Sequence, residues 1–254
     1  MKTESTRYNL IDSIRGLTII SMVLFHTCWD LVYFGVLSPE FMKALPAVIW
    51  QKSICCTFIF ISGFVFCLGK HHIKHGLVTL GCGVLITLVT CFLMPDAKDV
   101  FGVLWLLGIS TFIGIFVHGV LRKNEILPPV MLIISFILFI LFQNLVKGYI
   151  GIGSTVFISL PPALYRNYLT TLFGFPFAGF SSSDYFPIFP WSLLYICGLC
   201  SYLILCKKEG AMKHLRKDVP ALSFIGRHSL LIYMLHQPLV FGMLYLINSI
   251  LSSR

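Results

Sequence analysis

The stretch LIDSIRGLTIISMVLFHTCWD, residues 10–30, sets the first constraint on the fold. Its apolar character persists for about 20 positions, the length that an α-helix needs to cross roughly 30 Å of hydrocarbon. Charged residues interrupt the run at Asp12, Arg15 and Asp30. No small-residue cleavage site accompanies it, so we expect a membrane-spanning helix and no cleavable signal peptide.

The composition of the whole chain agrees with a membrane protein. Of its 254 residues, 57% are hydrophobic and 11% are charged, and the mean hydropathy is +0.89. A soluble domain averages about 25% charged residues, so this chain has too few polar groups to cover its own surface. These figures argue against a disordered chain, a nucleic-acid-binding protein and a small disulfide scaffold. The formal charge of +9 then indicates basic cytoplasmic loops, with membrane lipids as the surrounding partner.

Hydropathy and breaker residues predict an all-α polytopic bundle, with one transmembrane domain over residues 1–254. Seven apolar stretches lie near 10–33, 45–69, 76–94, 101–121, 127–146, 187–206 and 221–250. The last is so long that it must tilt, kink at Pro238 or lie partly among the headgroups.

The connection 147–186 is too long for a structureless loop. It is rich in aromatic residues, Gly and Pro. We therefore predict an outer cap that contains a re-entrant or interfacial helix around Pro162–Phe173.

Basic residues indicate the orientation. One set of alternate loops holds eleven of them: Lys2, Arg7, Lys70, Lys74, Arg122, Lys123, Lys207, Lys208, Lys213, Arg216 and Lys217. The other set holds six: Lys43, Lys52, Lys98, Lys147, Arg166 and Arg254. Because cytoplasmic loops carry the excess of Lys and Arg, we expect a multi-pass protein of the cytoplasmic (inner) membrane, with its N-terminus inside and its C-terminus outside.

The polar residues of the first stretch fall along one side of the predicted helix. Arg15 and His26 are eleven residues apart, which is about three turns, or ~16 Å of rise, and returns within about 20° of the same face. Asp12 lies one turn before Arg15, and Asp30 lies one turn after His26. Ionisable residues inside a span are costly, so this stripe, which also passes Met22, is expected to line the bundle interior or a water-filled cavity.

Two interpretations fit this stripe. In the first, Asp12 and Arg15 pair at the cytoplasmic interface and His26 makes a structural hydrogen bond. In the second, His26 is a general base, the commonest role of a neutral imidazole near pH 7. Asp30 would then fix the tautomer of His26, and Arg15 would bind a phosphate or carbonyl group.

Four segments make the second interpretation more specific. They are LIDSIRGLTIISMVLFH at 10–26, FIFISGF at 58–64, YFPIFPW at 185–191 and GRHSLLIYMLHQP at 226–238. The R-x10-H spacing in a first transmembrane helix resembles that of acyltransferase-3-like transmembrane acyltransferases. The four segments together resemble the bacterial relatives of heparan-α-glucosaminide N-acetyltransferase, and the likeness covers nearly the whole chain in the same order.

The resemblance implies acetyl transfer across the membrane, from cytoplasmic acetyl-CoA to a glycan or other small acceptor on the far side. His26 matches the motif histidine and would be catalytic, and Arg15 matches the motif arginine and would contact the donor. A homodimer would suit the family. One departure concerns the acceptor: the lysosomal enzyme uses a histidine in its first lumenal loop, whereas residues 31–50 contain none. His26 is then the candidate base of that region.

The last stretch holds a second polar cluster. Its members are Arg227, His228, Ser229, Tyr233, His236 and Gln237. The last four fall on one helical face, and we take His236 as a second catalytic or acceptor-orienting group. Arg227, His228, Ser229 and Tyr233 are predicted to bind the donor, with the basic loop 207–217 near its phosphates. The alternative is that Arg227 and His228 reach the headgroups while His236 bonds between helices.

Four residues of the outer side are predicted to bind the acceptor: Trp29, Arg166, Asp184 and Trp191. Aromatic rings with scattered polar groups suit a carbohydrate, although an ordinary interfacial aromatic belt has the same composition.

Other functions are less consistent with the sequence. We predict neither a metal nor a haem: the histidines of KHHIKH at 70–75 have no carboxylate or thiol beside them, and no two spans each offer two well-spaced histidines. The nine cysteines are expected to be small buried hydrophobes. The alternative function is a proton- or anion-coupled transporter that uses the polar stripe, but the internal repeats common in transporters are missing.

Overall fold

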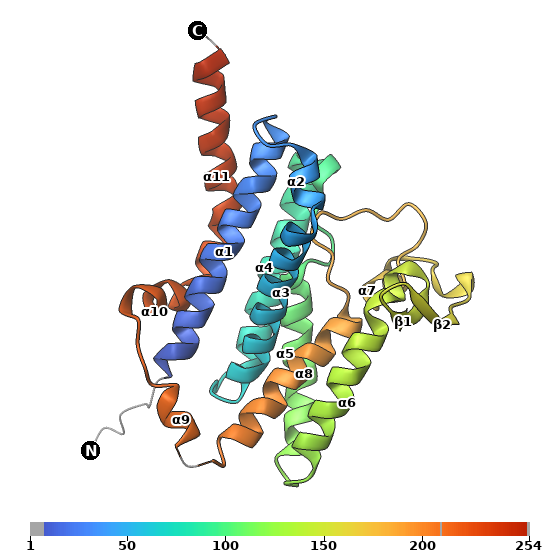
Figure 1. Cartoon of the computed structure of the whole chain (residues 1–254), viewed down its shortest axis with the longest axis vertical. Coiled ribbons are helices and arrows are strands. Elements are labelled where there is room, and N and C mark those ends of the chain that lie inside the picture. Colours follow the sequence, from blue (N-terminus) through green and yellow to red (C-terminus); the bar gives the residue numbers. More distant parts are fainter. Residues whose placement is uncertain (1–7, 209, 253–254) are drawn as a thin grey trace. The chain divides into compact units, whose positions relative to one another are not determined.

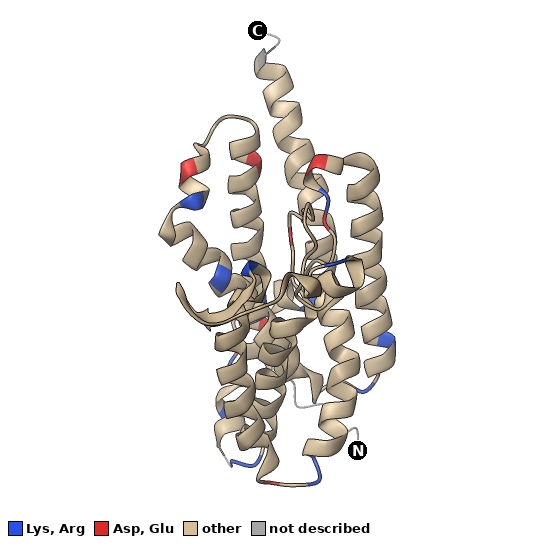
Figure 2. Ribbon diagram, turned by 90° about the vertical axis from the view of Figure 1, so that its right-hand side faces the viewer, with Lys and Arg blue, Asp and Glu red and all other residues tan. Residues whose placement is uncertain are grey.

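The computed structural model describes residues 8–208 and 210–252 (Figure 1). Within them, seven helices are long and apolar enough to cross a membrane. They are α1 (Asn9–Tyr33), α3 (Leu45–Phe66), α4 (His72–Leu93), α5 (Val103–Leu121), α6 (Leu127–Leu141) continued by the 3-10 turn η2 (Phe142–Lys147), α8 (Ile188–Leu205) and α11 (Ser229–Ser252). Few charged residues lie along these helices (Figure 2). The predicted seven-span helical bundle is confirmed.

The last apolar stretch, expected to run unbroken over 221–250, consists of two helices. Helix α10 (Pro220–Arg227) ends at His228, whose φ of −103° and ψ of 16° leave the helical region, and α11 begins at Ser229. Pro238, where a kink was expected, lies inside α11. The main break is therefore at His228, and α11 alone is of ordinary spanning length.

The connection 147–186 contains a β-hairpin that was not predicted from the sequence. Strand β1 (Tyr149–Ile152) pairs antiparallel with β2 (Thr155–Ser159). The side-chain amide of Asn144 donates hydrogen bonds to the carbonyls of Gly151 and Gly153 at 3.1 and 3.3 Å, which fixes the turn against the end of the preceding span.

The helix expected around Pro162–Phe173 is shorter than predicted and is preceded by a separate turn. The chain forms a 3-10 turn, η3 (Pro162–Leu164), and a separate short helix, α7 (Tyr168–Leu172). Tyr165 leaves the helical region with ψ of 67°, and the side chain of Asn167 accepts a hydrogen bond from the N–H of Thr170. Because Asn167 caps a new helix, one continuous helix does not form.

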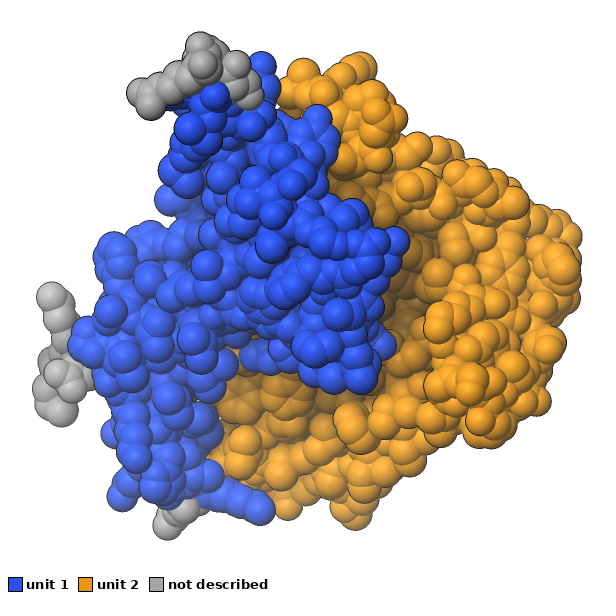
Figure 3. Space-filling view, turned by 45° about the horizontal axis from the view of Figure 1, so that its top comes forward, with its two compact units in different colours: residues 1–58, 208–254 blue, residues 59–207 orange. Residues whose placement is uncertain are grey.

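The chain divides into two compact units, which Figure 3 distinguishes by colour. Unit 1 comprises residues 1–58 and 208–254, and unit 2 comprises residues 59–207. Unit 1 therefore contains α1, α2 (Pro39–Lys43), the first part of α3, α9 (Ala211–His214), α10 and α11. That residues 1–254 act as one domain stays a prediction.

Unit 2 is held together by close helix packing. In it α4 packs on α5, and α8 packs on both α5 and α6. A Cβ atom on Gly198 of α8 would lie 1.9 Å from the carbonyl oxygen of Phe60 in α3, so only glycine permits this approach. Cys197 and Cys200 are buried in the same helix, where they pack as small apolar side chains.

Two aspartates lie where the loop 94–102 meets residues 182–186. The N–H of Val100 donates to Ser182 Oγ at 2.9 Å, and the N–H of Val103 donates to Asp184 Oδ2 at 3.4 Å. Burial, reinforced by the charge of Asp184, raises the pKa of the Asp99 carboxyl to about 8. Asp99 therefore keeps its proton in the folded protein at pH values at which an ordinary aspartic acid is ionised.

This pKa predicts that the folded protein loses stability as the pH rises from about 4 to about 8. The folded state then binds a proton that the unfolded chain releases, which costs up to about 1.4 kcal/mol per pH unit. Thermal unfolding of the detergent-solubilised protein across this range should show the loss, and Asp99→Asn should flatten it. The exposed Asp96→Asn is the matched control. Equal slopes for Asp99→Asn and wild type would contradict the prediction.

Candidate functional site

The site lies within unit 1 and begins with a direct backbone contact between α1 and α10. A Cβ atom on Gly226 would lie 1.8 Å from the carbonyl oxygen of Asp12, and one on Gly16 would lie 2.0 Å from that of Leu222. No side chain fits at either position. Ser13 Oγ also accepts a hydrogen bond from the N–H of Val219 at 3.3 Å. These contacts fix α10, and with it the first turn of α11, against the beginning of α1.

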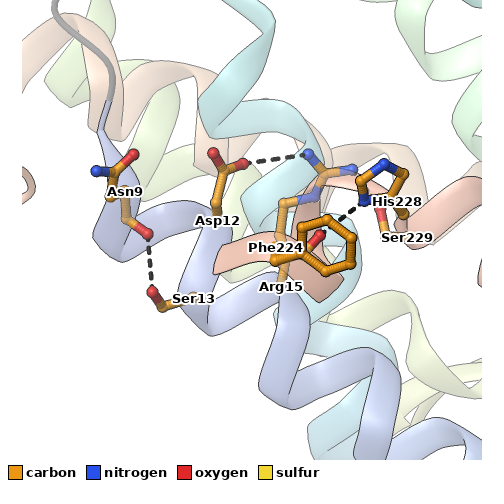
Figure 4. Close-up of polar contacts among 7 residues, drawn as sticks. All are labelled: Asn9, Asp12, Ser13, Arg15, Phe224, His228 and Ser229. Atoms are coloured by element: carbon orange, nitrogen blue, oxygen red, sulfur yellow. Dashed lines mark hydrogen bonds and ion pairs between the residues drawn. The ribbon is translucent and has the colours of Figure 1, made fainter. Parts of the chain in front are cut away.

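Arg15 occupies the junction that this contact creates. Its Nη2 donates a hydrogen bond to Ser229 Oγ at 2.6 Å, and its Nη1 lies 4.0 Å from Asp12 Oδ1 (Figure 4). The proximity of Asp12 and Arg15 agrees with the pairing considered from sequence. The Arg15 side chain nevertheless remains 28% exposed.

The other residues predicted to bind the donor lie at or after the same junction. Arg227 and His228 are exposed there, and the His228 ring lies 2.9 Å, Nδ1 to oxygen, from the carbonyl of Phe224 (Figure 4). Tyr233 is one turn further along α11, and its ring centroid lies 5.5 Å from that of His236. The structure therefore brings Arg15 and Ser229 together, with the exposed Arg227 and His228 directly before Ser229 in the chain.

The two histidines, which the sequence places in separate spans, meet within the membrane-spanning helices. The ring centroids of His26 in α1 and His236 in α11 are 5.0 Å apart. His236 Nδ1 lies 2.7 Å from the carbonyl oxygen of Tyr233. A carbonyl oxygen only accepts hydrogen bonds, so Nδ1 carries the proton and, in the neutral ring, Nε2 carries the lone pair. This tautomer leaves His236 with a basic atom directed away from its own backbone.

Asp30 has a different partner from the one expected. Its Oδ1 accepts a hydrogen bond from Gln237 Nε2 of α11 at 2.7 Å. Among the residues that the structure describes, no hydrogen bond joins Asp30 to His26. The sequence placed Gln237 on the polar face of α11 but gave no reason to pair it with α1.

The apolar side of α1 forms the core of unit 1. Met22, which the sequence placed in the polar stripe, is buried there together with Ile19 and Phe25. The Trp50 indole donates to Ser21 Oγ at 2.7 Å and packs edge-on against Phe25. The polar stripe is therefore discontinuous: between Arg15 and His26, the side chain of Met22 belongs to the apolar core.

The four residues predicted to bind the acceptor are dispersed over both units. Trp29, in unit 1, is 45% exposed. In unit 2, the Trp191 ring packs against Phe139 and Phe186, with centroids 5.4 and 5.0 Å away, and Asp184 contacts the start of α5. Arg166 is exposed. Binding of an acceptor by these four residues stays a prediction.

Comparison with known proteins identifies the family. Residues 7–238 match the family model described as heparan-alpha-glucosaminide N-acetyltransferase, catalytic. No curated protein and no solved structure matches the chain. Over the residues that the structure describes, no group of three or more His, Cys, Asp or Glu side chains is arranged to hold a metal ion. The matched region includes the R-x10-H helix, the α10–α11 junction and both histidines, and the chain belongs to the heparan-α-glucosaminide N-acetyltransferase catalytic-domain family.

Proposed function

We propose that the protein transfers an acetyl group from cytoplasmic acetyl-CoA to a hydroxyl or amine of a sugar-like acceptor at the outer face of the membrane. The observation that carries this proposal is the pair of imidazoles, His26 and His236, 5.0 Å apart between two spans. Membership of an acetyltransferase family favours an enzyme over the transporter considered from sequence.

The orientation rests on charge and on helix direction. Eleven basic residues in one set of loops, against six in the other, support an N-terminus on the cytoplasmic side. Helices α1 and α11 run in the same direction (Figure 1), as the first and the seventh span of a bundle should. Arg15 then lies near the cytoplasmic side and Asp30 towards the outer side, in the cytoplasmic membrane.

Arg15 is the proposed anchor of the donor. A guanidinium binds phosphate oxygens through paired, charge-assisted hydrogen bonds, and Ser229 holds this one in place at 2.6 Å. Arg227 and His228 add donors at the same junction. The rise from Arg15 to His26 is about 16 Å, a separation that an extended pantetheine chain can span, so the thioester would reach the histidines.

His26 is the proposed general base. As it removes the proton from the acceptor, the acceptor oxygen or nitrogen attacks the thioester carbonyl, the carbon–sulfur bond breaks and CoA leaves as a thiolate. The proton held by the imidazole pair then neutralises that thiolate. His236 supports this transfer because its neutral tautomer presents a basic Nε2, whose orientation is fixed by the Tyr233 carbonyl.

Loss of the base should abolish most of the activity. In His26→Ala we expect the rate of labelled acetyl transfer from acetyl-CoA to fall about 10²- to 10⁴-fold, the usual contribution of a positioned general base. The exposed His75→Ala serves as the control and should keep the wild-type rate. Transfer by purified His26→Ala at the wild-type rate would refute the assignment.

Loss of the anchor should affect binding of the donor. A hydrogen bond to a charged group is worth about 1.5–3 kcal/mol, so Arg15→Gln should weaken equilibrium binding of acetyl-CoA by about 10- to 100-fold. Arg122→Gln, at the exposed end of α5, removes the same charge elsewhere and should bind normally. If Arg15→Gln bound acetyl-CoA as tightly as wild type, Arg15 would have another role.

A further inference from the structure

Asp30 and Gln237 each keep an oxygen atom that their mutual hydrogen bond does not use. Asp30 is only 4% exposed, and its Oδ1 accepts from Gln237 Nε2 at 2.7 Å. The remaining atoms, Asp30 Oδ2 and Gln237 Oε1, are both buried, and none of the residues that the structure describes donates a hydrogen bond to either. Two buried hydrogen-bond acceptors, one on each of these two bonded side chains, are thus left within the membrane-spanning part of unit 1.

Such an arrangement is costly for a structural contact alone. A buried polar atom without a partner costs about 1–3 kcal/mol, and ionisable groups inside a span are usually retained for function. When Asp30 is ionised, its carboxylate and the Gln237 amide oxygen can only accept hydrogen bonds. The group that would satisfy both atoms is therefore one that presents two O–H or N–H donors.

The position of these two atoms relates them to the imidazole pair. Asp30 lies one helical turn after His26, and Gln237 directly follows His236. Both thus lie on the side of the histidines away from Arg15. Pro238 comes next in α11 and has no N–H to donate to the carbonyl of Met234. The backbone of α11 is consequently less constrained at this turn than in an uninterrupted helix.

We propose that Asp30 and Gln237 form the subsite that binds the acceptor. The bound group presents at least two neighbouring hydrogen-bond donors, such as adjacent hydroxyl groups, or a hydroxyl beside an amine, on a sugar ring. This inference rests on the proposed function, which it extends by naming the residues that select the acceptor. Asp30 then binds the acceptor rather than fixing the tautomer of His26.

One substitution separates this role from a purely structural one. In Asp30→Asn, the side-chain oxygen can still accept the hydrogen bond from Gln237, so the link between α1 and α11 persists. The other atom becomes an NH₂ group, which donates where Oδ2 accepted. If the Asp30–Gln237 pair were only structural, Asp30→Asn would keep close to the wild-type activity. If the pair binds the acceptor, the substitution puts a hydrogen-bond donor where the bound group needs an acceptor, and binding of the acceptor weakens.

The experiment measures the two substrates separately on the purified full-length protein. Binding of acetyl-CoA is measured at equilibrium, and CoA release is followed against the concentration of D-glucosamine or D-glucose, above the rate with water alone. For Asp30→Asn we expect the KM for the sugar to rise at least tenfold, while the Kd for acetyl-CoA stays within twofold of wild type. Asp218→Asn, an exposed carboxylate of the same unit, should change neither constant.

The possible outcomes are distinct. An unchanged sugar KM in Asp30→Asn would overturn the subsite, as would an equal loss of acetyl-CoA affinity. So would a wild-type protein that binds and slowly hydrolyses acetyl-CoA but is stimulated by neither sugar. A wild-type protein that neither binds acetyl-CoA nor releases CoA would overturn the proposed function itself.

Discussion

Polar side chains inside a membrane span need polar partners, and α1 finds its partners on the last helices of the chain. Arg15 bonds to Ser229, His26 meets the ring of His236, and Asp30 bonds to Gln237. Each of these contacts joins residues more than 200 positions apart in sequence. They explain why the first and the seventh span lie together in one compact unit, and they concentrate the polar groups of unit 1 along a single helical pair.

The contacts depend in turn on two glycines. Because Gly16 and Gly226 let the backbones of α1 and α10 touch, α10 ends beside Arg15, and the chain can turn at His228 and start α11 along α1. A side chain at either glycine would push α10 away and move Ser229 out of reach of the guanidinium. Packing of small residues, which is the usual means of close helix approach in membranes, thus sets the geometry of the polar groups.

Much of this arrangement can be predicted from the sequence, because it follows from hydropathy and helical periodicity. The seven spans and the common face of Arg15 and His26 are of this kind. The family resemblance is also visible in the quoted motifs. The break at His228 could not be predicted, because the apolar stretch 221–250 continues through this residue. Only the contact between α10 and α1 shows why α10 ends there. The β-hairpin was missed because its turn is fixed by Asn144, a residue that precedes the strands.

The tertiary contacts of individual side chains also could not be predicted from the sequence. The spacing of Asp30 and His26 suggested a hydrogen bond within one helix, whereas the tertiary fold offers Asp30 the amide of Gln237. Likewise, the sequence did not indicate that the Trp191 ring packs against Phe139 and Phe186, and sugar binding by Trp191 stays a prediction. Local periodicity shows which residues share a face of one helix, and tertiary packing decides which neighbour each of them meets.

The central claim is that the acetyl group crosses the membrane along α1, from the end that carries Arg15 to the end that carries Asp30. The most direct measurement uses sealed vesicles with the protein in one orientation, labelled acetyl-CoA on the side of the N-terminus and acceptor only on the opposite side. The account predicts labelled acceptor on the far side, with the released CoA remaining on the near side. If acetyl transfer occurred only when acceptor and acetyl-CoA shared a compartment, the claim would be wrong.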